Sequence, residues 1–355
     1  MDFSRPARHC VSAVFVAFLS YADASAAPPE YWQRWHIDTS GNGADGVDTA
    51  DFNRDGLRDV VTGWEQSGDI KLYLNPGAAL LKQPGAWPAI DISGGLKFEG
   101  IEDAAFIDLD LDGFADAVVS SSEGDTRALA IQWQTAAPNN IAQNWRGTVL
   151  SAEHPAAYMK ARAGQLDGVN GADIVAGTKA SKGEPSRVYW FKSPTQAGPD
   201  NAAAWQRFAV GENDAKTVTL LIRDMDGDGL ADIVSAGRQG VAWFKNPGAA
   251  ALAAPATSVN WEKIVITATG SEFTFCNLGP GQGDDMIAAT SKRSGMLAMW
   301  LKRLDASGRN WAEYPIRGDV PRPDWTSWDK FVLKGVACGF VDGADRIDVV
   351  FTASG

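Results

Sequence analysis

The segment Asp108-Leu-Asp110-Leu-Asp112-Gly113-Phe114-Ala-Asp116 decides the fold of this chain, because it is one of three closely similar acidic loops. The others are Asp51-Phe-Asn53-Arg-Asp55-Gly56-Leu57-Arg-Asp59 and Asp224-Met-Asp226-Gly-Asp228-Gly229-Leu230-Ala-Asp232. Side chains at loop positions 1, 3, 5 and 9, with a backbone carbonyl near position 7, can place several hard oxygens around one ion of calcium size. The glycine after position 5 allows the sharp turn that such a wrap requires. One copy would indicate little, since Asp, Asn and Gly dominate ordinary turns, whereas three copies in register predict calcium sites.

The acidic loops belong to a longer repeat. The Asp at loop position 9 recurs before a short apolar run, at spacings of 57, 57, 59, 53 and 63 residues, in Asp59, Asp116, Asp173, Asp232, Asp285 and Asp348. A second series agrees, because six tryptophans each stand five residues before an aliphatic residue: Trp32, Trp87, Trp145, Trp205, Trp261 and Trp311. Periods of this size, with several short strands per unit, are typical of a β-propeller or another repeat array.

The first unit contains four predicted strands. Residues 46–52 alternate into the acidic loop, 59–64 leave it, 69–74 follow a turn with glycine, and 87–92 come after the break at Asn75-Pro76-Gly77. Helical periodicity is nowhere sustained, so the sequence predicts an all-β protein. We expect four tryptophans of the second series to lie on outer strands and pack between neighbouring sheets: Trp87, Trp145, Trp205 and Trp261.

This layout resembles the FG-GAP and VCBS repeat propellers, a group that includes the integrin α-chain head, over roughly residues 31 to 355. The acidic loops, each followed by a Val/Ile strand, carry the resemblance. It implies a single β-propeller of six blades with four antiparallel strands each, in which a calcium loop joins the innermost strand of a blade to the second. The corresponding segments 165–173, 277–285 and 340–348 keep few of the ligands, and calcium is not carried over to them.

The resemblance and the loop spacing together predict Ca2+ as the cofactor of three loops. The residues expected to hold it, with Leu57, Phe114 and Leu230 acting through backbone carbonyls, are Asp51, Asn53, Asp55, Asp59, Asp108, Asp110, Asp112, Asp116, Asp224, Asp226, Asp228 and Asp232.

The two ends of the chain carry further signals. Arg5 and Arg8, an apolar stretch over 11–19 and Ala24-Ser25-Ala26 are typical of a secretory signal cleaved after residue 26, which leaves a propeller over 27–355 and predicts a secreted or periplasmic protein. Residues 32–37 match the fourth strand of later units, so we expect them to complete the last blade and close the ring. The sixth unit ends after its second strand, which indicates a truncated product or an irregular final blade.

Charge and cysteines bound the class of protein. The formal net charge of −12 argues against nucleic acid or an anionic membrane as partner. The apolar stretch is too short for a membrane anchor, and we expect a monomer.

Cys276 and Cys338 lie nine and ten residues before Asp285 and Asp348, on the inner strands of adjacent blades. Equivalent inner strands favour two separate buried cysteines over a disulfide, because a disulfide needs Cα atoms within about 7 Å.

Ligands of propellers usually sit over the channel mouth, on the face opposite the calcium loops. The loops that enter the inner strands bring Asp45, Glu102, Asp103, Lys160, Lys216, Glu272 and Lys330 there, and the hairpins after the second strands bring Glu65, Glu123, Lys179, Arg238 and Arg293. This face is acidic on one side and basic on the other, which suits a polar ligand such as an oligosaccharide, with Trp325, Trp328 or Tyr158 as stacking surfaces. Charged hairpin tips that are merely solvated are the alternative.

Two functional classes remain open. The chain has no nucleophile elbow, phosphate-binding loop or zinc spacing, which favours a non-enzymatic binding module for a glycan or extracellular protein. The alternative is a polysaccharide lyase, in which Arg238 or Lys179 neutralises a uronate carboxylate while Tyr158 or Lys160 removes the adjacent proton. Convergence of Tyr158, Lys160, Lys179 and Arg238 in one pocket would favour the lyase. A third reading is a structural role in a cell-surface complex.

Overall fold

The computed structural model describes residues 12–17, 36–81, 85–121, 127–134, 144–151, 157–181, 183, 185–198, 200–213, 216–238, 240–253, 259–278, 283–289, 296–317, 332–339 and 347–354. Over these residues the protein is all-β, as the sequence predicts. Its helical elements there are two four-residue helices, α1 (Ala78–Leu81) and α2 (Ala249–Leu252), and one 3-10 turn, Ala202–Ala204.

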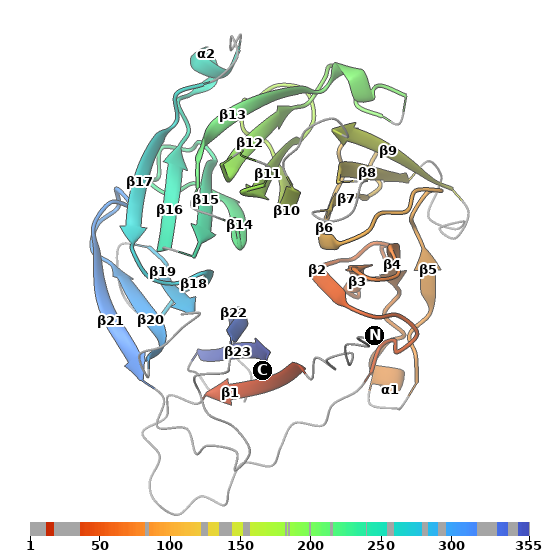
Figure 1. The fold of residues 1–355 in the computed structure, drawn as a ribbon, viewed down its shortest axis with the longest axis horizontal. Helices are drawn as coiled ribbons and strands as arrows, with labels where there is room; N and C mark the ends of the chain where they lie inside the picture. Colours follow the sequence, from red (N-terminus) through yellow and green to blue (C-terminus); the bar gives the residue numbers. More distant parts are fainter. Residues whose placement is uncertain are drawn as a thin grey trace, which may run out of the picture. The chain divides into compact units, whose positions relative to one another are not determined.

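Five sheets contain four strands each, and in every one the strands are ordered as in the chain (Figure 1). The first four sheets are formed by β2 (Ala44–Ala50), β3 (Asp59–Trp64), β4 (Asp69–Tyr73) and β5 (Ala89–Asp91); β6 (Ile101–Ile107), β7 (Asp116–Ser121), β8 (Leu129–Gln134) and β9 (Trp145–Ser151); β10 (Ala157–Gly164), β11 (Asp173–Lys179), β12 (Arg187–Lys192) and β13 (Gln206–Glu212); β14 (Thr219–Arg223), β15 (Asp232–Gly237), β16 (Gly240–Lys245) and β17 (Glu262–Thr267).

The fifth sheet consists of β18 (Glu272–Cys276), β19 (Asp285–Ala289), β20 (Met296–Arg303) and β21 (Trp311–Arg317). We call these five sheets repeats one to five. Each begins its second strand at the Asp that recurs in the sequence. Neighbouring strands in each sheet pair antiparallel. In repeat one, for example, Ala50 pairs with Asp59, and Leu72 pairs with Ile90. The four-strand unit predicted for residues 46–92 is confirmed.

The second strands are buried on both faces. In β7 and β15 all six residues are buried, and both strands read as an Asp followed by small and β-branched residues. Such continuous apolar runs are typical of strands that are covered on both sides. The recurring Asp at the start of each strand is therefore held in a dry environment, which matters for the loops described below.

Neighbouring repeats among repeats one to four share hydrophobic cores. One cluster joins repeats one and two and includes Phe52 and Ile101, and the next joins repeats two and three around Trp133 and Tyr158. Of the four tryptophans expected on outer strands, Trp145 opens β9, whereas Trp205 and Trp261 directly precede β13 and β17 and Trp87 stands two residues before β5. Trp205 and Trp261 are buried in these clusters, and Trp87 is half-buried. Trp145 is half-buried and stacks on Phe52, with ring centroids 5.6 Å apart.

The described residues fall into two compact units. One lies within 28–235 and 243–264, and the other within 1–27, 236–242 and 265–355. The first unit contains repeats one to three and all three acidic loops. The candidate metal sites therefore all lie inside that unit.

The sixth repeat forms a three-stranded sheet with the order β1-β23-β22, made of β22 (Val332–Gly339), β23 (Asp348–Ser354) and β1 (Ser12–Ala17). β1 pairs antiparallel with β23 and comes from the predicted signal segment. Most of the predicted closing strand, residues 32–35, lies outside the described residues. His36 and Ile37 are in no strand, and the Ile37 carbonyl accepts a hydrogen bond of 3.0 Å from the Trp87 N–H of repeat one.

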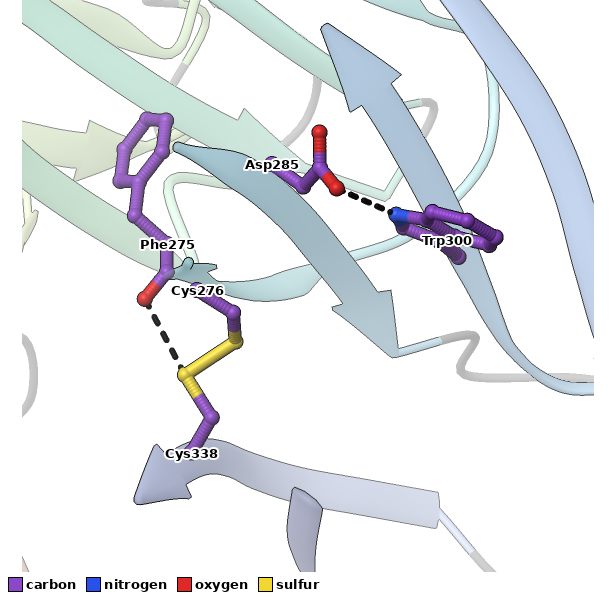
Figure 2. Close-up of a disulfide and its surroundings, with 5 residues drawn as sticks. All are labelled: Phe275, Cys276, Asp285, Trp300 and Cys338. Carbon is purple, nitrogen blue, oxygen red and sulfur yellow. Dashed lines mark hydrogen bonds between the residues drawn. A yellow bond between two sulfur atoms is a disulfide. The ribbon is translucent and has the colours of Figure 1, made fainter. Parts of the chain in front are cut away.

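Cys276 and Cys338 form a disulfide, so the preference for two separate cysteines was wrong (Figure 2). Their Cα atoms are 6.1 Å apart, within the range that a disulfide requires. The Cα atoms of adjacent inner strands lie closer together here than the spacing of the cysteines predicts. In the structure, β18 and β22 approach closely enough for Cys338 to join the same hydrophobic cluster as Cys276.

Candidate metal-binding loops

The connections between first and second strands share one backbone conformation. We call them loop 1 (51–59), loop 2 (108–116), loop 3 (165–173) and loop 4 (224–232). Positions 4 and 6 have left-handed backbone in all four, with φ values of 62° and 87° at Arg54 and Gly56, 61° and 89° at Leu111 and Gly113, 76° and 59° at Gly168 and Asn170, and 77° and 85° at Gly227 and Gly229. Asn and Gly adopt this region at low cost. Loop 3 therefore keeps the wrap although its acidic pattern is lost.

The Asp at position 9 holds each loop closed. In loop 2 one Asp116 oxygen accepts the Leu109 N–H at 3.1 Å and the other accepts the Gln134 N–H at 3.0 Å. Asp59, Asp173 and Asp232 make the same two bonds, to the amide at loop position 2 and to the amide after the third strand. Asp285 accepts the Arg303 N–H in the same way, and also the Trp300 indole N–H (Figure 2). This carboxylate is a structural clamp in repeats one to five.

Burial shifts the titration of these clamps. Desolvation raises the pKa of Asp116 to about 8, against the lowering effect of its two amide donors. The same cause raises the pKa of Asp173 and of Asp232 to about 6. A nearby cation would favour the charged form of each group.

Loop 2 has the arrangement expected of a metal site. Carboxylate oxygens of Asp108, Asp110 and Asp116 lie within 4.8 Å of one another. The Asp108 Oδ1 atom is buried and has no hydrogen-bond partner, which is costly for a carboxylate oxygen unless a cation compensates it. Desolvation by burial is the first cause of the raised pKa of Asp110, and the neighbouring carboxylates of Asp112 and Asp108 raise it further. Hard oxygens of this kind and number are what Ca2+ prefers, so the residues present fit the ion.

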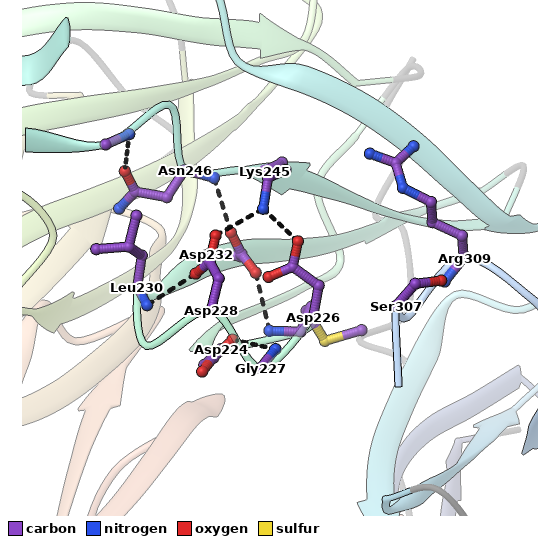
Figure 3. Close-up of polar contacts among 12 residues, drawn as sticks. Asp224, Asp226, Gly227, Asp228, Leu230, Asp232, Lys245, Asn246, Ser307 and Arg309 are labelled. Atoms are coloured by element: carbon purple, nitrogen blue, oxygen red, sulfur yellow. Dashed lines mark hydrogen bonds and ion pairs between the residues drawn. The ribbon is translucent and has the colours of Figure 1, made fainter. Parts of the chain in front are cut away.

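Loop 4 brings together Asp224, Asp226 and Asp232 in the same way, but a lysine from a neighbouring strand also contacts it (Figure 3). Lys245, the last residue of β16, makes an ion pair with Asp226, and its Nζ lies 2.7 Å from an Asp228 oxygen. These two hydrogen bonds raise the pKa of Lys245, and the bond from Lys245 is the first cause of the lowered pKa of Asp228. The sequence prediction missed this lysine because it lies outside the loop, 13 residues after Asp232.

In loop 1, two of the expected metal ligands hydrogen-bond to each other. The Asn53 side-chain N–H donates to Asp55 at 3.0 Å, and its oxygen accepts the Asp55 N–H at 3.1 Å. Among the residues that the structure describes, loops 2 and 4 bring three acidic groups within 4.8 Å of one another, whereas Asp51, Asp55 and Asp59 do not form such a group.

Loop 3 is neutralised from within. Asp167 at position 3 is buried and makes an ion pair with Lys192, the last residue of β12, while positions 1 and 5 are Gln165 and Val169. The Lys192 Nζ also donates to the Leu252 carbonyl at 3.1 Å. A protein ammonium group thus lies beside the carboxylate that a metal ion would need.

On the opposite face, the charged residues predicted to contact a ligand largely contact one another. Asp103 is buried and pairs with the Arg162 Nη1 at 2.5 Å and the Lys160 Nζ at 3.7 Å. Glu102, also buried, lies 3.8 Å from the Lys179 Nζ. These pairs link β6 of repeat two to β10 and β11 of repeat three. The acidic and basic sides of this face therefore neutralise each other across the repeat boundary.

The remaining candidates predicted for that face differ in burial. Tyr158 is fully buried with its ring 6.3 Å from that of Phe191, so it offers no stacking surface. Asp45 and Arg238 are exposed, and Arg238 belongs to the other compact unit from Tyr158, Lys160 and Lys179. Glu65, Lys216 and Glu272 are half-buried. Glu123, Arg293, Trp325, Trp328 and Lys330 lie outside the described residues.

A groove that the sequence did not reveal lies beside loop 2. It has a volume of about 690 Å³, and residues 109–112, 170–171, 194–198 and 200–201 contribute to its walls. Its lining includes the carboxylates of Asp110, Asp112 and Asp200 and the amides of Asn170 and Asn201. Asp200 also pairs with Arg146. The groove therefore presents hydrogen-bonding groups next to the best-formed acidic cluster.

A family model for FG-GAP-like repeats matches residues 51–119, so the resemblance drawn from the acidic loops is confirmed for that stretch. Among solved structures, a chain of the Photorhabdus luminescens Tc holotoxin pore is similar over 92% of this chain, at 16% identity and a TM-score of 0.41, and this chain spans 14% of its length. BBS1N, solved in complex with ARL6DN, is similar over 87% of this chain and 77% of its own, at 10% identity and a TM-score of 0.50. No curated protein sequence matches significantly. The fold is β-propeller-like. Within the described residues, no helix has the length and apolar character needed to cross a membrane.

Proposed function

We propose that this chain is a secreted, calcium-binding β-propeller of six blades that acts as a binding module for a glycan or an extracellular protein. The observation that carries the proposal is loop 2, where three carboxylates converge and the buried Asp108 Oδ1 atom lacks a partner. Asp108, Asp110, Asp112 and Asp116, with the Phe114 carbonyl, would hold the ion. Bound calcium would neutralise the loop and fix its position between the first two strands of repeat two.

Three contacts favour a binding module over a lyase. Lys160 and Lys179 pair with Asp103 and Glu102, so their charges are already compensated. Tyr158 is buried between sheets, away from any substrate. A lyase needs an accessible base beside an uncompensated cation, and these residues supply neither in this arrangement.

The groove beside loop 2 is the site that we assign to the ligand. Asp110 and Asp112 belong both to the loop and to the groove wall. Calcium in the loop would hold these side chains in place and lower the negative charge of the wall. A hydroxyl-rich glycan, or the polar backbone of a protein loop, suits the carboxylate and amide groups found there.

Calcium dependence is tested by melting the purified protein in 10 mM calcium and in chelator. For an extracellular site with a Kd of about 10⁻⁴ to 10⁻³ M, calcium should add roughly 1.4 to 2.7 kcal/mol of stability. The double variant Asp108→Asn, Asp110→Asn should lose this gain, while Asp200→Asn, which removes a groove carboxylate outside the loop, should keep it. A melting temperature that is the same in calcium and in chelator would refute the calcium assignment.

Ligand binding is tested separately on a glycan array probed in calcium and in chelator, with product analysis on uronate polymers. The proposal predicts retention of glycans or captured proteins that weakens in chelator and in Asp112→Asn, and no cleavage. Unsaturated uronate products would instead establish the lyase.

A further inference from the structure

One position near the end of the third strand divides the repeats into two groups. Its place is fixed by the next residue, whose backbone N–H donates to the position-9 Asp in repeats one to five. Repeats one and two have Leu74 and Trp133 there, whereas repeats three, four and five have Lys192, Lys245 and Lys302. The side chain at this place can reach the loop, as Lys192 and Lys245 both do.

The ammonium group of Lys245 contacts the oxygens that a metal ion in loop 4 would use. It makes an ion pair with Asp226 at position 3, and it lies 2.7 Å from Asp228 at position 5 (Figure 3). Lys192 makes the equivalent contact with Asp167 at position 3 of loop 3. The two lysines come from the same strand position in different repeats, so this contact recurs with the repeat and is not a chance surface pair.

We propose that Lys245 is a tethered cation that takes the place of calcium in loop 4, so that loop 4 is closed to the metal although its acidic sequence matches that of loop 2. This inference rests on the proposed calcium function of the loops. It lowers the number of calcium sites below the three expected from the sequence. It also makes this position near the end of the third strand the determinant of which loops bind metal.

The two cations exclude each other for a simple reason. Calcium needs carboxylate oxygens at 2.3 to 2.6 Å, and the Lys245 ammonium already holds one oxygen each of Asp226 and Asp228. A divalent ion in the same loop would also repel the ammonium at close range. Metal can therefore enter loop 4 only if Lys245 leaves both carboxylates. In loop 2 the equivalent residue is the uncharged Trp133. A buried carboxylate oxygen lacks a hydrogen-bond partner in both loops, Asp108 Oδ1 in loop 2 and Asp226 Oδ1 in loop 4, so the ammonium group of Lys245 is what distinguishes loop 4.

Loop 3 supplies an internal contrast. It has the same kind of lysine, but its positions 1 and 5 are Gln165 and Val169, so removing Lys192 would not create a calcium ligand set. Removing Lys245 would leave four aspartates in loop 4. Lys245→Met and Lys192→Met should therefore share their effect on stability and differ in their effect on calcium binding.

The experiment measures calcium stoichiometry by equilibrium dialysis and melting temperature in chelator, on the full chain and its variants. Lys245→Met should bind one calcium more than the parent, and Lys192→Met the same number as the parent. Both variants should melt several degrees lower than the parent in chelator, because each leaves carboxylates uncompensated. Lys97→Met, which removes a lysine paired with Asp69 on the surface, controls for the change in net charge and should alter neither value.

Two results would overturn the inference. If Asp226→Asn removes one calcium from the parent protein, loop 4 already holds metal and Lys245 does not exclude it, while the proposed calcium function stands. If Lys245→Met melts like the parent in chelator, the lysine does not compensate the loop. By contrast, loss of all calcium binding in the parent and in Lys245→Met would refute the proposed function itself, and with it the inference.

Discussion

Loops 2 and 3 have the same left-handed backbone at two positions, but they differ in how their carboxylates are compensated. Both are left-handed at positions 4 and 6, and both are closed by a buried Asp that accepts two amide N–H groups. Loop 2 concentrates four carboxylates and leaves one buried oxygen without a partner, whereas loop 3 retains Asp167 and compensates it with Lys192. The comparison separates two roles of the acidic motif. Position 9 maintains the fold, whereas positions 1, 3 and 5, together with the residue near the end of the third strand, determine whether a loop needs an external cation.

The largest expected effect comes from removing a clamp. Asp116→Ala and Asp173→Ala each leave two amide N–H groups without their acceptor, and at a cost of about 1 to 3 kcal/mol per buried donor each should destabilise the protein by roughly 3 to 5 kcal/mol. Urea denaturation in chelator measures both. If Asp173→Ala costs less than about 1 kcal/mol, the clamp is not a structural requirement and the comparison fails.

A smaller effect is expected from pH, and it isolates loop 3. Burial raises the pKa of Asp173 to about 6, so its contribution is fully present below about pH 4 and is lost as the pH rises through 6. The folded state binds this proton more tightly than the unfolded state, so stability falls with rising pH, by on the order of 3 kcal/mol in total.

The measurement compares the parent with Asp173→Asn in urea denaturation from pH 4 to 7, in chelator. The difference in stability between parent and variant should shrink as the pH rises. A constant difference would show that Asp173 ionises normally in the folded protein.

The smallest effect concerns position 5 of loop 2. Asp112→Asn should reduce the stabilisation by calcium by about 1 kcal/mol, since one charged ligand of several is lost, and it should change nothing in chelator. In loop 3, Val169→Asp together with Lys192→Met tests the reverse change, because it supplies the missing carboxylate and removes the internal cation. Calorimetric titration should detect weaker binding in the first variant and a new weak site in the second. Identical calcium binding in all three proteins would contradict the division of roles.

Much of the fold follows from the sequence because the repeat signals are local. The position-9 Asp and the Val/Ile run after it predict the second strands, and the tryptophans predict the fourth strands. Loop 3 appeared to depart from the motif, yet its backbone persists because Gly168 and Asn170 adopt the left-handed conformation at the two required positions. The ligand pattern and the loop geometry are therefore separate signals.

The contacts between repeats could not be predicted in the same way. Glu102 and Lys179 looked like opposite sides of a ligand site, but adjacent sheets bring them within 3.8 Å of each other. Lys245 compensates loop 4 from a different strand, and only alignment of the repeats would have revealed that Lys192 and Lys302 occupy the same place. The disulfide of Cys276 and Cys338 likewise depends on the approach of β18 and β22.

The central claim, that loop 2 binds calcium and loop 3 does not, is tested most directly by a crystal structure determined in saturating calcium with anomalous scattering data. The account predicts one strong anomalous peak in loop 2, with oxygens of Asp108, Asp110 and Asp116 at about 2.3 to 2.6 Å. It predicts no peak in loop 3, where Lys192 should still contact Asp167. A peak in loop 3, or a loop 2 that contains water alone at saturating calcium, would contradict the account.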